Sequence, residues 1–415
     1  MGLSNDNFKR VIRFQPCILS NFEKYYSLST QNNLTHHLIH WFDHNQREMP
    51  WRLNKDPYRI WLSEIILQQT QVKQGMPYFN KFITAYPTVN YLALANEDEL
   101  LKMWQGLGYY SRARNLHFTA KYVSNSLQGI FPTNYSDLIK LKGVGEYTAA
   151  AIASIAYNEP VAVLDGNVVR VLSRLFEINE TVQSAAGLQK FRFYANEILN
   201  KTQPGVHNQA MMELGSLVCK PTQPLCNICP IYEHCSAFLH KSIVNFPVKK
   251  KKIKVKNRYL TFIVPCIEDG KTLLVKRTGN DIWKNLYTFP CIETEAEWDM
   301  NHINVLMERM HDMEKAEIGV IKKTRHVLTH QIIHATFLQL KIYQKFDLES
   351  FKDALDGFNA SNSSKENTTL NQQKYATLEK SNIFEVDLNE LNKRYALPRL
   401  ISRYLESMDW NLILN

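Results

Sequence analysis

The chain has 415 residues, of which 45% are hydrophobic, so there is room for two or three domains with sizeable cores. It contains no apolar run of the ~18 residues that cross a bilayer and no signal-peptide pattern, so we expect a protein without a membrane anchor. The net charge of +9 favours a polyanionic partner. Four of the seven cysteines lie close together, which indicates metal ligation in a reducing compartment rather than disulfides.

The first two thirds of the chain are predicted to be helical. Residues 1–30 are polar and weakly patterned, so we expect an extension there. Between residues 31 and 240, runs with helical periodicity alternate with Pro and Gly, and no convincing strand ladder is seen. This region is predicted to be a mostly α domain. Residues 241–257 are rich in lysine and form a basic linker, for which a solvated connection and phosphate contact both remain open.

The pattern becomes β-like over residues 258–415, which predicts an α+β domain. Residues 356–380 are rich in Asn, Ser, Gln and Lys and are predicted to be a flexible insertion. Residues 384–405 return to order and end in a basic helix. The predicted strands are a hairpin of Tyr259–Ile267 with Thr272–Arg277, followed by Trp283–Pro290, Lys323–Thr329 and His334–Tyr343.

An unusual acidic residue lies in the stretch 56–72. Asp56 is suited to cap a helix, and Pro57 suits its first position. Glu64 then interrupts an apolar run of Trp, Leu and Ile. A lone helical Glu is ordinarily a solvated surface residue, but these neighbours also allow a buried acid with a raised pKa.

The most specific pattern is the spacing of Cys219, Cys226, Cys229 and Cys235, with six, two and five residues between them. Four thiolates within so short a segment are able to hold one metal centre. Structural zinc is the alternative, but zinc sites usually pair their ligands as two close doublets. Only Cys226 and Cys229 form such a doublet, so an iron–sulfur cluster is the favoured interpretation.

Two further segments have features of a functional site. Gly143, Val144 and Gly145 precede an alanine-rich helix, and such a turn exposes backbone N–H groups that suit one phosphate, although many Gly-x-Gly turns are only turns. Asp165 ends an apolar run and begins a helix, so it is either a plain N-cap or a reactive carboxylate that the helix dipole keeps ionised. Glu64 and Asp165 together match the chemistry of glycosidic bond cleavage, with one neutral acid and one anion.

These segments together resemble the adenine DNA glycosylase family of the helix-hairpin-helix, or endonuclease III, superfamily. The resemblance covers residues 34–240 with high specificity and 257–405 more loosely. It implies a helical glycosylase region that carries a [4Fe-4S] cluster on the four cysteines and a C-terminal Nudix-like domain that recognises the lesion. The matching segments are Met49–Arg52, Trp61–Val72, Gly106–Asn115, Leu141–Thr148, Leu164–Arg174 and the four cysteines.

The resemblance also implies roles for single residues. Glu64 occupies the position of the general acid, and Asp165 that of the carboxylate that stabilises the oxocarbenium ion, with Asn167 nearby. Tyr147 supports this centre and fills the position where related lyases carry a Schiff-base lysine. A phenol cannot form that imine, so we expect a hydrolase without strong lyase activity.

Other matching residues are expected to contact DNA. The hairpin Gly143, Val144 and Gly145 matches the phosphate-binding turn, and Leu328, Thr329 and His330 match the family's Phe-Ser-His loop, which reads 8-oxoguanine. Around residues 293–319 the pattern of a Nudix hydrolase is missing, which argues against diphosphate hydrolysis. The remaining residues expected near the flipped adenine, the lesion base or the gap in the duplex are Trp51, Arg52, Gln69, Thr70, Leu107 and Tyr109.

The resemblance therefore predicts a cytoplasmic, nucleoid-associated monomer of a bacterial-type cell that acts on duplex DNA with adenine opposite 8-oxoguanine or guanine. The base must leave the stack before it is cleaved. Three rival hypotheses are an endonuclease III-like glycosylase and lyase for oxidised pyrimidines, a non-catalytic DNA-binding module, and a Nudix-type nucleotide hydrolase.

Overall fold

The computed structural model describes residues 28–248, 255–267, 270–309, 316–342, 348–349, 351–353, 355 and 382–408. The predicted extension lies outside these residues up to position 27, as does the predicted insertion 356–380. The chain forms two compact units, Met1–Ile83 with Thr119–Lys251 and Thr84–Phe118 with Lys252–Asn415. The boundaries predicted from the sequence, at residues 240 and 258, do not anticipate that residues 84–118 group with the C-terminal part.

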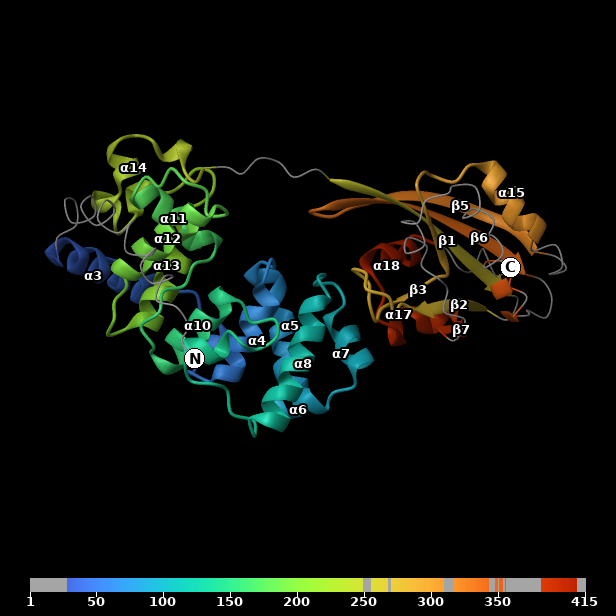
Figure 1. The fold of residues 1–415 in the computed structure, drawn as a ribbon, viewed down its shortest axis with the longest axis horizontal. Helices are drawn as coiled ribbons and strands as arrows, with labels where there is room; N and C mark the ends of the chain where they lie inside the picture. The colour runs from blue at the N-terminus through green and yellow to red at the C-terminus, as the bar shows by residue number, and fades with distance from the viewer. Residues whose placement is uncertain are drawn as a thin grey trace, which may run out of the picture. The chain divides into compact units, whose positions relative to one another are not determined.

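The first unit is built from helices, as the sequence predicted (Figure 1). Helix α13 contacts α3, α10 and α11, and α10 also contacts α4. The core of buried side chains follows this arrangement and includes Leu34, Leu172 and Leu214. The helices are α3 (Leu28–Asn45), α4 (Pro57–Leu67), α5 (Val72–Ala85), α8 (Ser111–Ser126), α9 (Tyr135–Leu138), α10 (Glu146–Tyr157), α11 (Gly166–Leu175), α12 (Ala185–Glu197), α13 (Pro204–Leu217) and α14 (Ser236–Leu239), where α5 and α8 extend into the second unit.

Helix α4 begins and ends where its sequence dictates. The Asp56 side chain accepts a hydrogen bond from the Tyr58 backbone N–H, and Pro57 is the first helical residue. The helix ends at Leu67, and Gln69 follows in the left-handed region with φ 55°. Every residue of the helix from Ile60 to Ile66 is buried, so Glu64 lies inside the protein.

The second unit contains a seven-stranded sheet with the order β3-β2-β1-β6-β5, in which β4 pairs with β1 and β7 pairs with β2. The pairing of β1 with β6 is parallel, and the other pairings are antiparallel. Side chains such as Ile263, Leu338 and Phe351 form its core. The strands are β1 (Lys256–Ile267), β2 (Lys271–Lys276), β3 (Tyr287–Thr288), β4 (Cys291–Thr294), β5 (Ala316–Val327), β6 (Gln331–Ile342) and β7 (Ile383–Asp387).

The predicted hairpin of this sheet is confirmed, with Ile267 opposite Lys271. The prediction of a strand over Trp283–Pro290 is wrong in extent, because only Tyr287 and Thr288 pair, and Asn285 turns the chain with φ 62°. Strand β1 begins at Lys256, inside the segment expected to be a linker. Strand β5 begins at Ala316, seven residues before the predicted start.

Helices also cover parts of the second unit. Tyr404 stacks on the Phe337 ring at 3.9 Å between ring centroids and so holds α18 to β6. Within the residues that the structure describes, no helix has both the length and the apolar character needed to cross a bilayer. The helices of the second unit are α6 (Val89–Leu94), α7 (Glu97–Trp104), α15 (Met300–Arg309), α17 (Leu391–Arg394) and α18 (Arg399–Glu406).

Gly205, at the start of α13, permits a close approach to α10. A Cβ atom at Gly205 would lie 2.6 Å from the Ser154 carbonyl oxygen and 2.8 Å from the Ile155 Cα. Because both are backbone atoms, we expect Gly205→Ala to lower the free energy of unfolding by about 1–3 kcal/mol. Thermal denaturation measures this, with Gly279→Ala as control because no atom lies within 4 Å of its Cβ position. Equal melting temperatures for both variants would contradict the close packing.

Candidate active site and cysteine loop

Glu64 is a buried acid on α4, with 8% of its surface exposed. The Tyr147 hydroxyl donates a hydrogen bond of 2.6 Å to its Oε2 atom. Burial, together with the negative charge of Asp165, raises the pKa of Glu64 to about 7, although the Tyr147 hydrogen bond and the Arg52 charge oppose the rise. The expectation of a buried acid is confirmed, and Glu64 is able to hold a proton near neutral pH.

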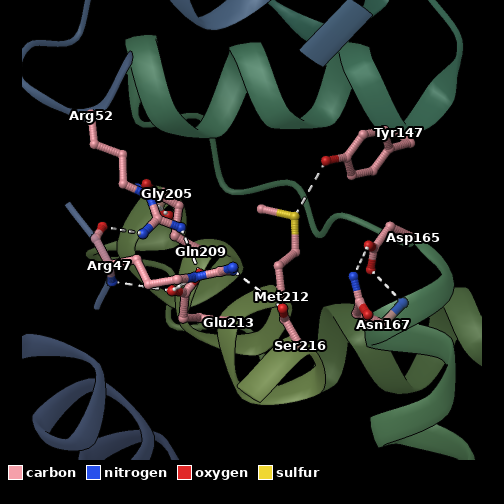
Figure 2. A network of polar contacts seen from close by, with 10 residues as sticks. All are labelled: Arg47, Arg52, Tyr147, Asp165, Asn167, Gly205, Gln209, Met212, Glu213 and Ser216. Atoms are coloured by element: carbon pink, nitrogen blue, oxygen red, sulfur yellow. Dashed lines mark hydrogen bonds and ion pairs between the residues drawn. The ribbon is translucent and has the colours of Figure 1, made fainter. Parts of the chain in front are cut away.

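Tyr147 lies on α10, and its hydroxyl points toward Met212 of α13 (Figure 2). Its hydroxyl oxygen lies 3.3 Å from the Met212 sulfur. Burial and then the negative charges of Glu64 and Asp165 raise the pKa of Tyr147 well above its ordinary value. The phenol therefore keeps its proton and acts as a donor to Glu64.

Asp165 caps α11, as one of the two interpretations of the sequence predicted. Its Oδ1 accepts hydrogen bonds from the backbone N–H groups of Asn167, at 2.9 Å, and Val168, at 2.7 Å. Its Oδ2 accepts from the Asn167 amide at 2.8 Å. Burial raises the pKa of Asp165 above its ordinary value, although these hydrogen bonds and the charge of Arg170 oppose the rise. The sequence analysis considered the helix dipole, which favours the ionised form, but not burial, which acts in the opposite direction.

An acidic residue missed by the sequence interpretation lies beside this group. Glu213 on α13 is 1% exposed and pairs with Arg47, at 2.6 Å, and with Arg52, at 3.0 Å (Figure 2). Burial raises the pKa of Glu213, but the two guanidinium groups more than offset it, and the pKa lies below its ordinary value. The available signal was a lone charged residue between apolar neighbours, Met211, Met212 and Leu214, as it was for Glu64. Met212 gave no such signal.

The predicted DNA-contacting residues of the first unit differ in exposure. Gln69 is exposed in the loop after α4, with the partly buried Thr70 beside it. Gly143 and Gly145 are exposed in the turn before α10, where Gly143 has φ 81°. Trp51 is only 6% exposed and packs edge-on against Phe79, so its ring contributes to the core, and a contact with DNA remains a prediction.

The residues predicted to surround the lesion base belong to the second unit. Tyr109 is 48% exposed with φ 48°, and its hydroxyl lies 3.1 Å from the Thr329 hydroxyl, 220 residues further along the chain. Leu107 is only 6% exposed. Leu328 and His330 flank Thr329 in the turn between β5 and β6, where the Leu328 N–H donates to the Gln331 carbonyl at 2.9 Å.

The four clustered cysteines line one cavity. Cys219 follows α13, and the other three lie in the short turns up to α14. Burial, together with the neighbouring thiols, raises the pKa of Cys229 to about 12. In the part of the chain that the structure describes, no three His, Cys, Asp or Glu side chains are arranged to hold a single metal ion.

Two arginines of α11 support this loop. Arg174 is 3% exposed and donates to the Cys219 sulfur at 3.3 Å and to the Lys220 carbonyl at 2.8 Å. Arg174 therefore ties α11 to the first residues of the cysteine loop. Arg170 donates to the Cys219 carbonyl at 2.7 Å and to the Asn167 amide oxygen at 2.8 Å, so it connects the loop to the start of α11.

Comparison with known proteins agrees with this arrangement. The family model described as "HhH-GPD superfamily base excision DNA repair protein" matches residues 62–192, and the NUDIX domain model matches residues 262–407. The adenine DNA glycosylase of Buchnera aphidicola subsp. Schizaphis graminum is 38% identical over 273 residues, which are 65% of this chain and 78% of that protein. The adenine DNA glycosylase of Buchnera aphidicola subsp. Baizongia pistaciae is 35% identical and covers 72% of this chain and 83% of its own.

More distant organisms have similar proteins. The adenine DNA glycosylase of Homo sapiens is 41% identical over 209 residues, which are 48% of this chain and 38% of the human protein. A solved structure described as a thermostable thymine-DNA glycosylase is 26% identical with a TM-score of 0.47, and the alignment covers 51% of this chain and 97% of the other.

The pKa of Glu64 predicts how stability depends on pH. Its folded-state pKa, about 7, lies above the ordinary value of 4.5, so the native state holds the proton more tightly than the unfolded state. The stability that this tighter proton binding adds to the native state is present below about pH 4.5 and is lost as pH rises through about 7. We therefore expect the free energy of unfolding of Glu64→Gln, relative to that of the unsubstituted protein, to rise by about 2–3 kcal/mol between about pH 5 and pH 8. Urea unfolding across this range measures the difference, and a constant difference would contradict the raised pKa.

Proposed function

The chain belongs to the adenine DNA glycosylase family, and from this premise we propose that it excises adenine paired with 8-oxoguanine or guanine in duplex DNA. The observation that carries the proposal is the pair of carboxyl groups around Tyr147. Glu64, with a pKa of about 7, accepts one hydrogen bond from Tyr147, whereas Asp165 accepts three from Asn167 and Val168. The two environments suit an acid and an anion, which is the division of labour in glycosidic cleavage.

In the proposed reaction, adenine leaves the base stack and enters the site beside Glu64. About half of the Glu64 carboxyl groups are protonated at pH 7 if the pKa is about 7. The neutral acid gives its proton to the base, because adenine leaves the sugar more easily as a neutral molecule than as an anion. The C–N bond then breaks, its electron pair stays with the base, and the sugar becomes an oxocarbenium ion. Glu64, now ionised, takes a proton from the water that adds to the sugar.

Asp165 supplies the negative charge in this scheme. Its hydrogen bonds hold the carboxylate in place, so no reorganisation is needed as positive charge develops on the sugar. Asn167 positions it from the first turn of α11, and Tyr147 holds Glu64 through its hydroxyl. Arg52, held by Glu213, keeps a positive charge near Glu64 and limits the rise of its pKa.

Tyr147 also bears on the alternative function, an endonuclease III-like glycosylase and lyase. Such a lyase needs an amine that forms an imine with the sugar, and a phenol offers none. The Tyr147 phenol is directed at Glu64 instead. We therefore favour a glycosylase that acts by hydrolysis.

We place DNA recognition in both units. The exposed turn at Gly143 and Gly145 suits one phosphate, since Gly145 begins α10 without a side-chain cap. Gln69 and Thr70 are proposed to enter the duplex, with Tyr109 and the turn Leu328–His330 around 8-oxoguanine. Thr329 keeps the hydroxyl of the family's serine, while Leu328 lacks the aromatic ring of its phenylalanine.

Cys219, Cys226, Cys229 and Cys235 are proposed to hold a [4Fe-4S] cluster, with the cation of Arg174 beside Cys219. When bound, the cluster would supply a covalent tie between the end of α13 and the turns before α14. We further propose that the protein acts as a monomer at the nucleoid of a bacterial-type cell.

The proposed reaction predicts that replacing the carboxyl group of Glu64 by an amide strongly lowers the rate of adenine excision. Glu64→Gln keeps the size of the side chain but has no proton to give, so single-turnover adenine excision should fall by at least about 10²–10⁴-fold. Asp165→Asn should also abolish turnover because the negative charge is lost. Duplexes with adenine opposite 8-oxoguanine, adenine opposite guanine and thymine glycol are the substrates, and only the first two should be cleaved by the unsubstituted protein.

Binding to a duplex with a non-cleavable adenine analogue is the control, and it should stay within about threefold for Glu64→Gln, because the proposed phosphate and lesion contacts involve other residues. Excision by Glu64→Gln at the unsubstituted rate would remove Glu64 from the mechanism. Cleavage of thymine glycol in place of adenine would favour the alternative function.

The cysteine loop predicts about four irons per chain in protein purified without oxygen, with broad absorption near ~400 nm. Cys226→Ser should lower the iron content, whereas Cys266→Ser, a buried cysteine of β1, should leave it unchanged. Stoichiometric zinc without iron, measured by elemental analysis, would contradict the cluster.

A further inference from the structure

Helix α7 begins with three acidic residues, Glu97, Asp98 and Glu99, a composition that the helix dipole alone would explain. The structure shows a more specific use for one of them. Asp98 accepts two hydrogen bonds from the Lys276 ammonium, at 2.7 and 2.9 Å, and a third from the Tyr287 hydroxyl at 2.9 Å. Lys276 and Tyr287 lie on β2 and β3, so Asp98 joins α7 to one edge of the sheet.

The other end of α7 is joined to the C-terminal helices. Lys102 Nζ donates to the backbone carbonyl oxygens of Asn392 and Tyr395, at 2.5 and 3.0 Å. It also donates to the Gln105 side chain at 2.9 Å, and the Gln105 amide donates to the Ser402 hydroxyl at 3.0 Å. Both ends of α7 are therefore fixed to separate parts of the same unit.

The chain after α7 continues this attachment. The Tyr110 hydroxyl, in a side chain only 6% exposed, donates to the Leu397 carbonyl at 3.2 Å. Arg114 donates to the Lys284 carbonyl at 2.7 Å. The loop before these contacts turns sharply. Gly106 and Gly108 have φ 107° and 70°, which glycine adopts at no steric cost, whereas Tyr109 has φ 48°, which is costly for a residue with a side chain. Such a loop keeps its shape only when its surroundings hold it.

This loop ends at Tyr109, whose hydroxyl meets that of Thr329 at the tip of the β5–β6 turn. Arg112 lies over the Tyr109 ring, 5.7 Å from its centroid, and over the Trp104 ring at 5.2 Å. The two tips that the proposed function assigns to the lesion base thus come from separate segments. One hydrogen bond between exposed hydroxyls is too weak to align them, so the alignment depends on the attachment of α7.

We propose that Asp98 and Lys102 are positioning residues that anchor residues 97–114 to the sheet and so hold Tyr109 and Thr329 together as one lesion-reading surface. The inference rests on the proposed function for the identity of the ligand, the 8-oxoguanine base. The contacts of Asp98 and Lys102 are hydrogen bonds and an ion pair, whereas Leu100, Leu101 and Trp104 of α7 are buried apolar residues. We expect a single charge change at Asp98 to loosen the polar contacts while the apolar packing stays in place.

The test uses Asp98→Asn in the full chain. Single-turnover excision of adenine opposite 8-oxoguanine should fall about 3- to 10-fold, the range of coupling between neighbouring groups, while excision opposite guanine should change less than about twofold. A variant with the charges exchanged, Asp98→Lys with Lys276→Asp, should restore the ratio of the two rates to within about twofold. Rescue of this kind is not expected if Asp98 only complements the dipole of α7, which Asn96 caps.

Glu385→Gln is the matched control, because it removes the acid of another ion pair of β2, with Lys271 at 3.6 Å, far along the strand from Lys276. Its rate ratio should equal that of the unsubstituted protein. An unchanged ratio in Asp98→Asn, or an equal fall of both rates that the exchanged pair does not restore, would overturn the inference.

A second measurement separates this inference from the proposed function. Hydrogen–deuterium exchange of the DNA-free protein should become at least about threefold faster in Asp98→Asn over both residues 104–110 and 327–332, and it should stay unchanged in Glu385→Gln. Faster exchange only around Asp98 would refute the anchor even if the excision rates agreed. If the unsubstituted protein failed to excise adenine, the proposed function would fall, and the exchange would still decide whether α7 anchors the two tips.

Discussion

The chemistry proposed for this protein depends on burying one carboxyl group without losing its proton. Glu64 is placed among Trp61, Ile65 and Ile66, whose side chains are all buried. Taking an ionised carboxylate out of water is costly, and the cost is lowered by binding a proton, which is why the pKa of Glu64 rises to about 7. Tyr147 limits this rise by donating to the carboxylate, so the two effects together set the acid near neutral pH.

The second carboxyl group, that of Asp165, is proposed to stay ionised although it is buried. Asp165 also experiences burial, but it begins a helix, and the N–H groups of Asn167 and Val168 have no carbonyl partners within that helix. These donors stabilise the anion and offset part of the cost of burial. Two acidic residues in one site therefore differ because one lies within a helix, whose N–H groups are already used, and the other lies at the start of a helix.

The sequence was sufficient for features that depend on local chemistry. The cap at Asp56, the cap at Asp165 and the four cysteines all involve residues close together in the chain, where spacing fixes geometry. Contacts between distant residues were not predictable in this way. Glu213 meets Arg47 and Arg52 across more than 160 residues, and nothing in the spacing indicates which arginines pair with it. The predicted length of the strand at Trp283–Pro290 was wrong, because pairing partners, rather than apolar character, decide where a strand ends.

The grouping of residues 84–118 with the C-terminal part follows from the same distinction. Periodicity identified α7 as a helix but not what it packs against, since an acidic first turn is expected of any helix N-terminus. Its partners are Lys276 and the carbonyl groups near Asn392, which lie more than 170 residues further along the chain and become neighbours of α7 only in the folded unit. A helix next to the catalytic region in sequence thereby belongs, in its contacts, to the unit that carries Thr329. The lesion-reading residues are then brought together by tertiary contacts, whereas the pKa of the catalytic acid depends on the burial of its own helix. Mutations are therefore able to change lesion reading and acid strength separately.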